Sequence, residues 1–232
     1  MLNLIWFIPL LPLAGAILNL ILGRKFGDPR SGWVATIATG TSFLVTVLVY
    51  FEMLGLEAEE RSHVEVLFRW LPVGSLQVDF ALLADPLSIV MALFITGIST
   101  LIHLYAIGYM HGDAKFSKFF LYLNLFVFSM LMLVMGENLL VTFLGWEGVG
   151  ACSYFLISFW HTRNSAAVAG KKAFVTNRIG DFGVMTAMFL AFSAVGSLSY
   201  GAINEAAHAG ELASVTATAI AMLLFVGACG KS

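Results

Sequence analysis

The chain has 232 residues, of which 59% are hydrophobic and 11% carry a charge. Soluble globular domains usually contain about 25% charged residues, so this composition excludes an ordinary soluble core. The net charge of −2 gives no sign of the basic surface that binds nucleic acid. The 22 glycines and 20 phenylalanines suit helices that pack closely in lipid. We therefore expect an all-α polytopic membrane protein.

Seven apolar stretches are long enough to cross a hydrocarbon core of about 30 Å. In chain order they are Leu2–Leu22, Trp33–Met53, Pro86–Gly108, Phe119–Met135, Leu139–Trp160, Ala173–Val195 and Val215–Ser232. We interpret them as about seven transmembrane helices.

Two of the connecting segments have patterns of their own. Residues Val64–Leu83 alternate on both sides of the turn-forming Pro72-Val73-Gly74. This pattern predicts a β-hairpin at the membrane surface, with an irregular interfacial loop as the alternative. The segment Ser199–Ala213 is more polar, which predicts a short amphipathic helix lying in the interface.

The basic residues predict how the chain is oriented, because Lys and Arg are enriched in cytoplasmic loops. The first, third and fifth loops hold Arg24, Lys25, Arg30, Lys115, Lys118, Arg163, Lys171 and Lys172. The second loop has an excess of acidic residues, and the fourth and sixth have no Lys or Arg. We therefore expect a multi-pass protein of the bacterial inner (cell) membrane with its N-terminus outside. The hairpin, within about residues 57–84, would then lie on the outer face.

Four charged residues lie well inside predicted spans, where a charge costs at least about 2.5–3.5 kcal/mol on insertion scales. Glu147 lies near the middle of the fifth span, and intramembrane acids of this kind mark proton paths. The alternative is a neutral carboxyl held by a hydrogen bond. Lys231, in the seventh span, is a natural partner for such an acid, or else its ammonium snorkels to the interface. Arg178 and Asp181 are spaced i, i+3 and share a helix face. They either belong to the ion path or form a static ion pair that fixes helix packing.

Two further residues are weaker candidates. His103 lies inside the third span, where it either relays protons or packs as a satisfied neutral ring. Lys172 starts the sixth span and either reaches inward or acts as a positive-inside anchor. A membrane haem protein would need paired intramembrane axial ligands, and His103 is the one histidine well inside a span. We expect no metal site.

These residues lie in long motifs. DPLSIVMALFITGISTLIHLYAIGYM, FFLYLNLFVFSMLMLVMGENLLVTFLGWEGVGACSYFLISFW and KKAFVTNRIGDFG closely resemble the largest antiporter-like subunit of proton-pumping NADH–quinone oxidoreductase. This complex is respiratory complex I, and the subunit is called L in bacteria and 5 in mitochondria. Subunits of multi-subunit sodium/proton antiporters share the architecture, but GWEGVG…SYFLISFW and HLYAIGYM are more similar to the complex I version.

The resemblance implies a role for each position that matches. Glu147 matches the motif glutamate of helix five, and Lys231 matches the lysine of helix seven. In the family these two form the ion pair thought to drive protonation changes in the channel. Lys172, Arg178 and Asp181 match charged positions of helix six near the neighbouring subunit.

The resemblance also implies what surrounds this chain. His103 matches a family histidine. No cofactor is expected in this chain, because the complex would use NADH, FMN, iron–sulfur clusters and quinone in other subunits. The expected partners are other membrane subunits of complex I, especially the adjacent antiporter-like subunit.

Finally, the resemblance suggests how the chain is divided. Residues 1–114 would hold helices one to three with the outer-face hairpin. Residues 115–232 would begin the antiporter-like proton-translocating domain and stop within helix seven, so we expect a truncated chain. The expected function is redox-coupled proton translocation through a Glu/Lys ion-pair path. The alternatives are a sodium/proton antiporter subunit, or a structural or assembly piece without transport of its own.

Overall fold

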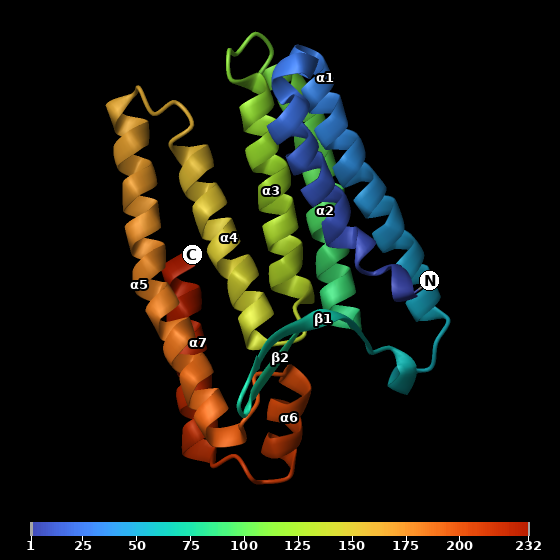
Figure 1. The fold of residues 1–232 in the computed structure, drawn as a ribbon, viewed down its shortest axis with the longest axis vertical. Coiled ribbons are helices and arrows are strands. Elements are labelled where there is room, and N and C mark those ends of the chain that lie inside the picture. The colour runs from blue at the N-terminus through green and yellow to red at the C-terminus, as the bar shows by residue number, and fades with distance from the viewer. Residues whose placement is uncertain (1, 232) are drawn as a thin grey trace. The chain divides into compact units, whose positions relative to one another are not determined.

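The structure, a computed structural model, describes the backbone of residues 2–231 and all of their side chains except that of residue 3. Within this range six helices are long and apolar enough to cross a membrane by length and composition. They are α1 (Phe7–Leu54), α2 (Pro86–Tyr109), α3 (Phe116–Met135), α4 (Leu139–Ile157), α5 (Asn164–Val195) and α7 (Ser214–Lys231) (Figure 1). The smaller elements are the 3-10 turns Leu2–Leu4 and Ala58–Glu60, the strands β1 (His63–Val73) and β2 (Leu76–Ala84), and the helix α6 (Tyr200–His208).

The longest helix, α1, consists of two membrane segments. Gly27 has φ 64° and ψ −166°, a conformation that glycine adopts readily, and Asp28 is extended. The helix is interrupted there and the chain folds back, so the two halves of α1 lie side by side (Figure 1). The Ser42 hydroxyl of the second half donates to the Ile8 carbonyl of the first at 2.6 Å. The prediction of about seven spans is therefore confirmed, with the first two as the halves of α1.

Contacts divide the chain into two compact units. The first unit comprises Met1–Glu65 and Leu82–Met135, and thus α1, α2 and α3. Polar contacts join its helices: the Ser31 and Ser117 hydroxyls lie 3.0 Å apart. Such hydrogen bonds between helices act in lipid, where no hydrophobic driving force holds helices together.

The second unit comprises Val66–Ala81 and Gly136–Ser232, with α4 to α7. Its core consists of Val78, Leu139, Ala187, Met188, Ala191, Leu198 and Ile220. The helices α5 and α7 approach each other through glycines. A Cβ added at Gly180 would come within 2.9 Å of the Gly230 Cα, and one at Gly230 within 2.7 Å of the Gly180 Cα. Small residues at such positions let membrane helices meet backbone to backbone.

The predicted hairpin is confirmed as β1 paired with β2. The turn falls at Gly74, with φ 58°, whereas Pro72 still belongs to β1. The hairpin is stabilised by the stacked rings of Phe68 and Phe80, whose centroids are 4.9 Å apart.

The helix predicted between the sixth and seventh spans is present as α6, which the start of α4 holds in place. The Leu139 amide donates to the Leu198 carbonyl at 3.0 Å. The Tyr200 hydroxyl donates to the Thr142 hydroxyl at 2.8 Å. Burial raises the pKa of Tyr200, so this phenol remains a hydrogen-bond donor over the physiological range. The location of α6 in the membrane interface stays a prediction.

The helix ends differ from the predicted span ends most at the start of α5 and at the start of α1, which begins at Phe7 rather than Leu2. The helix α4 ends at Ile157 rather than Trp160, and α5 already begins at Asn164. In α5 the backbone hydrogen bonding continues beyond the apolar part that hydropathy locates, whereas in α4 the helix stops before the apolar Phe159 and Trp160. Lys172 therefore belongs to α5 and not to a loop.

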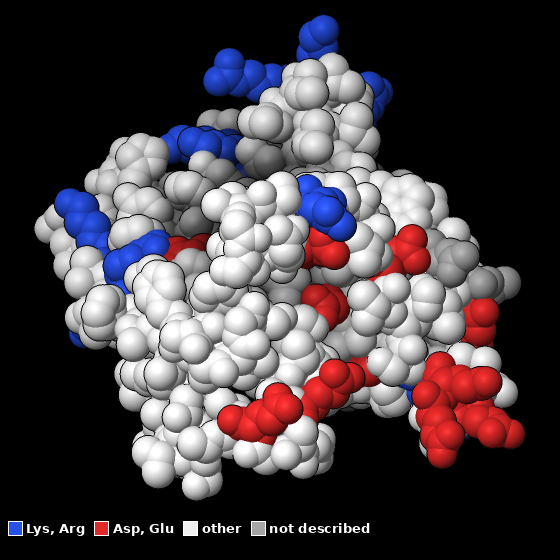
Figure 2. Space-filling view, turned by 60° about the horizontal axis from the view of Figure 1, so that its bottom comes forward, with Lys and Arg blue, Asp and Glu red and all other residues white. Residues whose placement is uncertain are grey.

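On the face drawn in the space-filling view, the charged side chains are confined to patches on a mostly uncharged surface (Figure 2).

Candidate functional site

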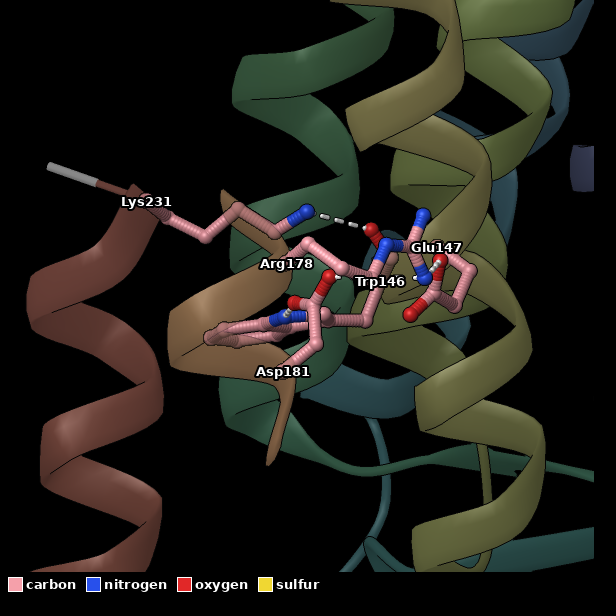
Figure 3. A network of polar contacts seen from close by, with 5 residues as sticks. All are labelled: Trp146, Glu147, Arg178, Asp181 and Lys231. Atoms are coloured by element: carbon pink, nitrogen blue, oxygen red, sulfur yellow. Dashed lines mark hydrogen bonds and ion pairs between the residues drawn. The ribbon is translucent and has the colours of Figure 1, made fainter. Parts of the chain in front are cut away.

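A cluster of charged side chains lies where α4, α5 and α7 meet in the second unit. Glu147 and Trp146 come from α4, Arg178 and Asp181 from α5, and Lys231 from α7 (Figure 3). Two acids and two bases are thus gathered within membrane helices. Their formal charges cancel, which lowers the cost of placing them away from water.

Arg178 serves both carboxylates of the cluster. Its Nη1 donates to the Oε2 of Glu147 and lies 3.6 Å from the Oδ2 of Asp181. The pairing expected from the i, i+3 spacing of Arg178 and Asp181 is therefore present. The guanidinium also lies 4.8 Å from the ring centroid of Phe174. Both contacts with the carboxylates are made by Nη1, which carries two of the five N–H donors of the planar guanidinium.

The two acids differ in how they are satisfied. Asp181 is almost completely buried, at 1% exposure, and its Oδ1 accepts the indole N–H of Trp146 at 2.6 Å. Both of its oxygens therefore face a donor. In Glu147 the Oε1 atom is buried and has no hydrogen-bond partner among residues 2–231. Glu147 is thus the acid that has room for a proton or for a new donor.

Lys231 is held by Trp146. Its Nζ donates to the Trp146 carbonyl at 2.7 Å and lies 5.3 Å from the centroid of the indole ring. Gly150 leaves the space for this ammonium, since a Cβ there would lie 2.8 Å from Nζ. Between the described side chains no ion pair joins Lys231 to Glu147, which differs from the pair that the resemblance implies. The ammonium of Lys231 is instead held by the carbonyl and the ring of Trp146.

The structure does not bring the two weaker candidates into this cluster. His103 belongs to the first unit and is 1% exposed. Its Nδ1 lies 2.7 Å from the Ser99 carbonyl and its Nε2 lies 2.7 Å from the Oδ1 of Asn124. This arrangement is that of a buried ring fixed by hydrogen bonds. Lys172 is exposed on α5, and its role in transport stays a prediction.

Sequence reasoning missed Trp146 and Asn124. Trp146 directly precedes the intramembrane Glu147, and Asn124 is a polar residue within a predicted span. Both signals were visible, but neither tells which neighbour the side chain contacts. Across the part of the chain that the structure describes, no group of three His, Cys, Asp or Glu residues could hold a metal ion.

Two protein families match successive parts of the chain. Residues 70–120 match the family described as NADH-Ubiquinone oxidoreductase (complex I), chain 5 N-terminus. Residues 136–232 match the family described as NADH:quinone oxidoreductase/Mrp antiporter, TM. The Mrp complex from Dietzia sp. has the same fold, with a TM-score of 0.82 at 22% identity over 98% of this chain and 24% of that one.

These matches define the class: an antiporter-like, multi-pass membrane protein. NADH-quinone oxidoreductase subunit L of Mycobacterium tuberculosis is 45% identical over 98% of this chain and 35% of its own length. Subunit L of Escherichia coli is 36% identical over 99% of this chain and 37% of its own. The chain belongs to the family of NADH-quinone oxidoreductase subunit L and chain 5. It spans about a third of the length of these relatives.

Proposed function

We propose that this chain is part of a membrane subunit of NADH–quinone oxidoreductase and takes part in redox-coupled proton translocation. The observation that carries the proposal is the charged cluster of α4, α5 and α7, in which Glu147 retains an unpartnered buried oxygen. Buried charges of this kind are expensive and mark ion pathways.

The step that we propose is an exchange of partners. The ammonium of Lys231 leaves the Trp146 carbonyl and moves to the free Oε1 of Glu147, while Arg178 shifts toward Asp181. Glu147 stays a carboxylate while Arg178 or Lys231 contacts it. It takes up a proton from the ion path in an intermediate in which Arg178 has moved to Asp181 and Lys231 is still on the Trp146 carbonyl. The arrival of the Lys231 ammonium then releases this proton, so one cycle moves one proton on and off the Glu147 carboxyl.

The test is Glu147→Gln in the intact complex, reconstituted in vesicles. We expect the rate of proton translocation to fall about tenfold or more, because an amide cannot take up and release the proton. The hydrogen bond from Arg178 to a charged group, which contributes about 1.5–3 kcal/mol, is also lost. Proton uptake coupled to NADH oxidation is the measurement. The matched control is Glu205→Gln, which removes an exposed carboxyl from α6. An unchanged ratio of protons to NADH in the Glu147 variant would refute the proposed role.

The proposal extends to the surroundings of the chain. No cofactor is assigned to it, since NADH, FMN, iron–sulfur clusters and quinone would be bound by other subunits. The partners would be other membrane subunits of the complex, first of all the adjacent antiporter-like subunit.

We also propose the division into residues 1–114, with helices one to three, and 115–232, which begin the ion-handling domain. All five residues of the charged cluster fall in the second part.

We propose the bacterial inner membrane as the location, with the N-terminus outside. The positive-inside pattern of the loops supports this orientation. In a background with Cys152 and Cys229 replaced by alanine, a cysteine at Thr162 should react with a membrane-impermeant maleimide only in inverted vesicles. A cysteine at Glu59 should react only in intact cells. Both positions are exposed, so the reverse pattern would contradict the orientation.

One alternative function is favoured by a specific observation, the fold shared with the Mrp complex. A subunit of a sodium/proton antiporter would exchange the two ions across vesicles without NADH. The oxidoreductase function is favoured over the antiporter function because the oxidoreductase relatives are 36–45% identical to this chain, against 22% for the Mrp chain. A purely structural or assembly role would be supported by a chain that binds neighbouring subunits but whose cluster variants leave ion transport unchanged.

A further inference from the structure

Trp146 is the residue of the cluster that touches both a base and an acid without being charged itself. Its indole N–H donates to Asp181 at 2.6 Å, and its ring face lies 5.3 Å from the ammonium of Lys231. Its carbonyl accepts from the same ammonium at 2.7 Å. One residue of α4 therefore contacts the charged groups of both α5 and α7 (Figure 3).

The chemistry of these contacts is specific to tryptophan. An indole offers an N–H donor at its edge and an electron-rich face for a cation. Phenylalanine keeps a face and loses the donor, whereas leucine loses both. The carbonyl contact belongs to the backbone and remains in either variant. The side-chain contacts can therefore be removed one at a time.

We propose that Trp146 is a positioning residue of the site, which holds Lys231 on its ring and carbonyl while its indole N–H holds Asp181. In this arrangement the two oxygens of Asp181 already face Trp146 and Arg178. The ammonium of Lys231 therefore stays available to move to Glu147. The inference rests on the proposed function, because it assigns Trp146 to the same exchange of partners. It adds that the acid on α5 and the base on α7 are coupled through a neutral ring on α4.

The experiment measures proton translocation per NADH in the reconstituted complex with Trp146→Phe and Trp146→Leu, each alone and combined with Asp181→Asn. We expect Trp146→Phe to lower the translocation rate about tenfold, the size expected from one hydrogen bond to a charged group. Trp146→Leu should lower it by about threefold more, as a partly exposed cation–π contact is lost. Trp160→Phe, elsewhere in the same unit, is the matched control and should leave the rate unchanged.

The double variants decide whether Trp146 acts through Asp181. Because an indole N–H bonds a neutral amide more weakly than a carboxylate, the loss from Trp146→Phe should shrink to about threefold or less in the Asp181→Asn background. Equal losses in both backgrounds would overturn the inference. So would a Trp146→Phe complex with the unchanged rate.

A second measurement keeps the test informative if Asp181→Asn alone abolishes transport. The infrared difference spectrum of the purified complex on titration contains carboxyl bands, and the band lost in Asp181→Asn should shift in Trp146→Phe but not in Trp160→Phe. An unshifted band would overturn the inference.

If Glu147→Gln lowers the ratio of protons to NADH while Trp146→Phe changes neither rate nor band, the positioning role alone fails. If Glu147→Gln has no effect, the proposed function fails, and a shifted band still supports the Trp146 contact with Asp181.

Discussion

Replacement of Arg178 by leucine is expected to lower proton translocation more than any other change to a cluster residue that does not itself bind the proton. The guanidinium is the nearest cation to both Glu147 and Asp181. Without it, Glu147 loses its hydrogen-bonded cation, and Asp181 keeps the indole N–H of Trp146 but loses its nearest cation. Removing one partner of a buried ion pair costs about 3–5 kcal/mol, and we discount this because the Arg178 side chain is 45% exposed. The expected loss is about ten- to a hundredfold.

The measurement is the rate of proton uptake per NADH oxidised in vesicles containing the complex. Arg178→Lys should recover part of the loss, because a lysine restores the charge but cannot present two donors in a fixed fork. Lys171→Leu, which removes an exposed cation from the same helix, is the control. Full activity of Arg178→Leu would show that the guanidinium only assists packing.

Replacement of Gly180 by leucine should prevent the subunit from accumulating in the membrane. The Cβ alone would lie 2.9 Å from the Gly230 Cα and 3.0 Å from the Gly227 carbonyl oxygen, and a backbone cannot yield as a side chain can. Overpacking of this kind typically costs about 1–3 kcal/mol, and a larger side chain costs more. Losses of about 1–2 kcal/mol already change abundance several-fold.

The amount of subunit and of assembled complex in membranes measures this effect, by immunoblot and native gel. Gly180→Ala should give an intermediate level. Gly108→Leu is the matched control, since a Cβ at that glycine of α2 has nothing within 4 Å. Equal abundance of the Gly180 and Gly108 variants would mean that α5 and α7 do not pack as described.

Most of the fold could be predicted from the sequence because its signals are local. Span length and hydropathy predict the membrane helices, and alternation on both sides of a turn predicts the hairpin. The turn position was predicted too early because Pro72 was read as part of the turn. In a two-stranded sheet each strand has a free edge, where a missing N–H does no harm, so Pro72 remains within β1.

The partners within the site could not be predicted in the same way. The scarcity of intramembrane charge singles out Glu147, Arg178 and Asp181, and the i, i+3 spacing gives one of their contacts. The contact of Arg178 with Glu147 depends on how α4 packs against α5, which no local pattern encodes. Trp146 was overlooked because aromatic residues make up 13% of the chain. An indole becomes informative only when its neighbours are known.

The glycine contact of α5 with α7 has a mechanical consequence. Where two backbones touch directly, no layer of side chains lies between them whose rotamers could change. We expect α5 and α7 to move together as a pair, with Lys231 at the end of α7 and Arg178 and Asp181 along α5. A displacement of this pair would change the positions of all three charges relative to Glu147 at once. The exchange of partners would then follow the movement of a rigid helix pair relative to α4.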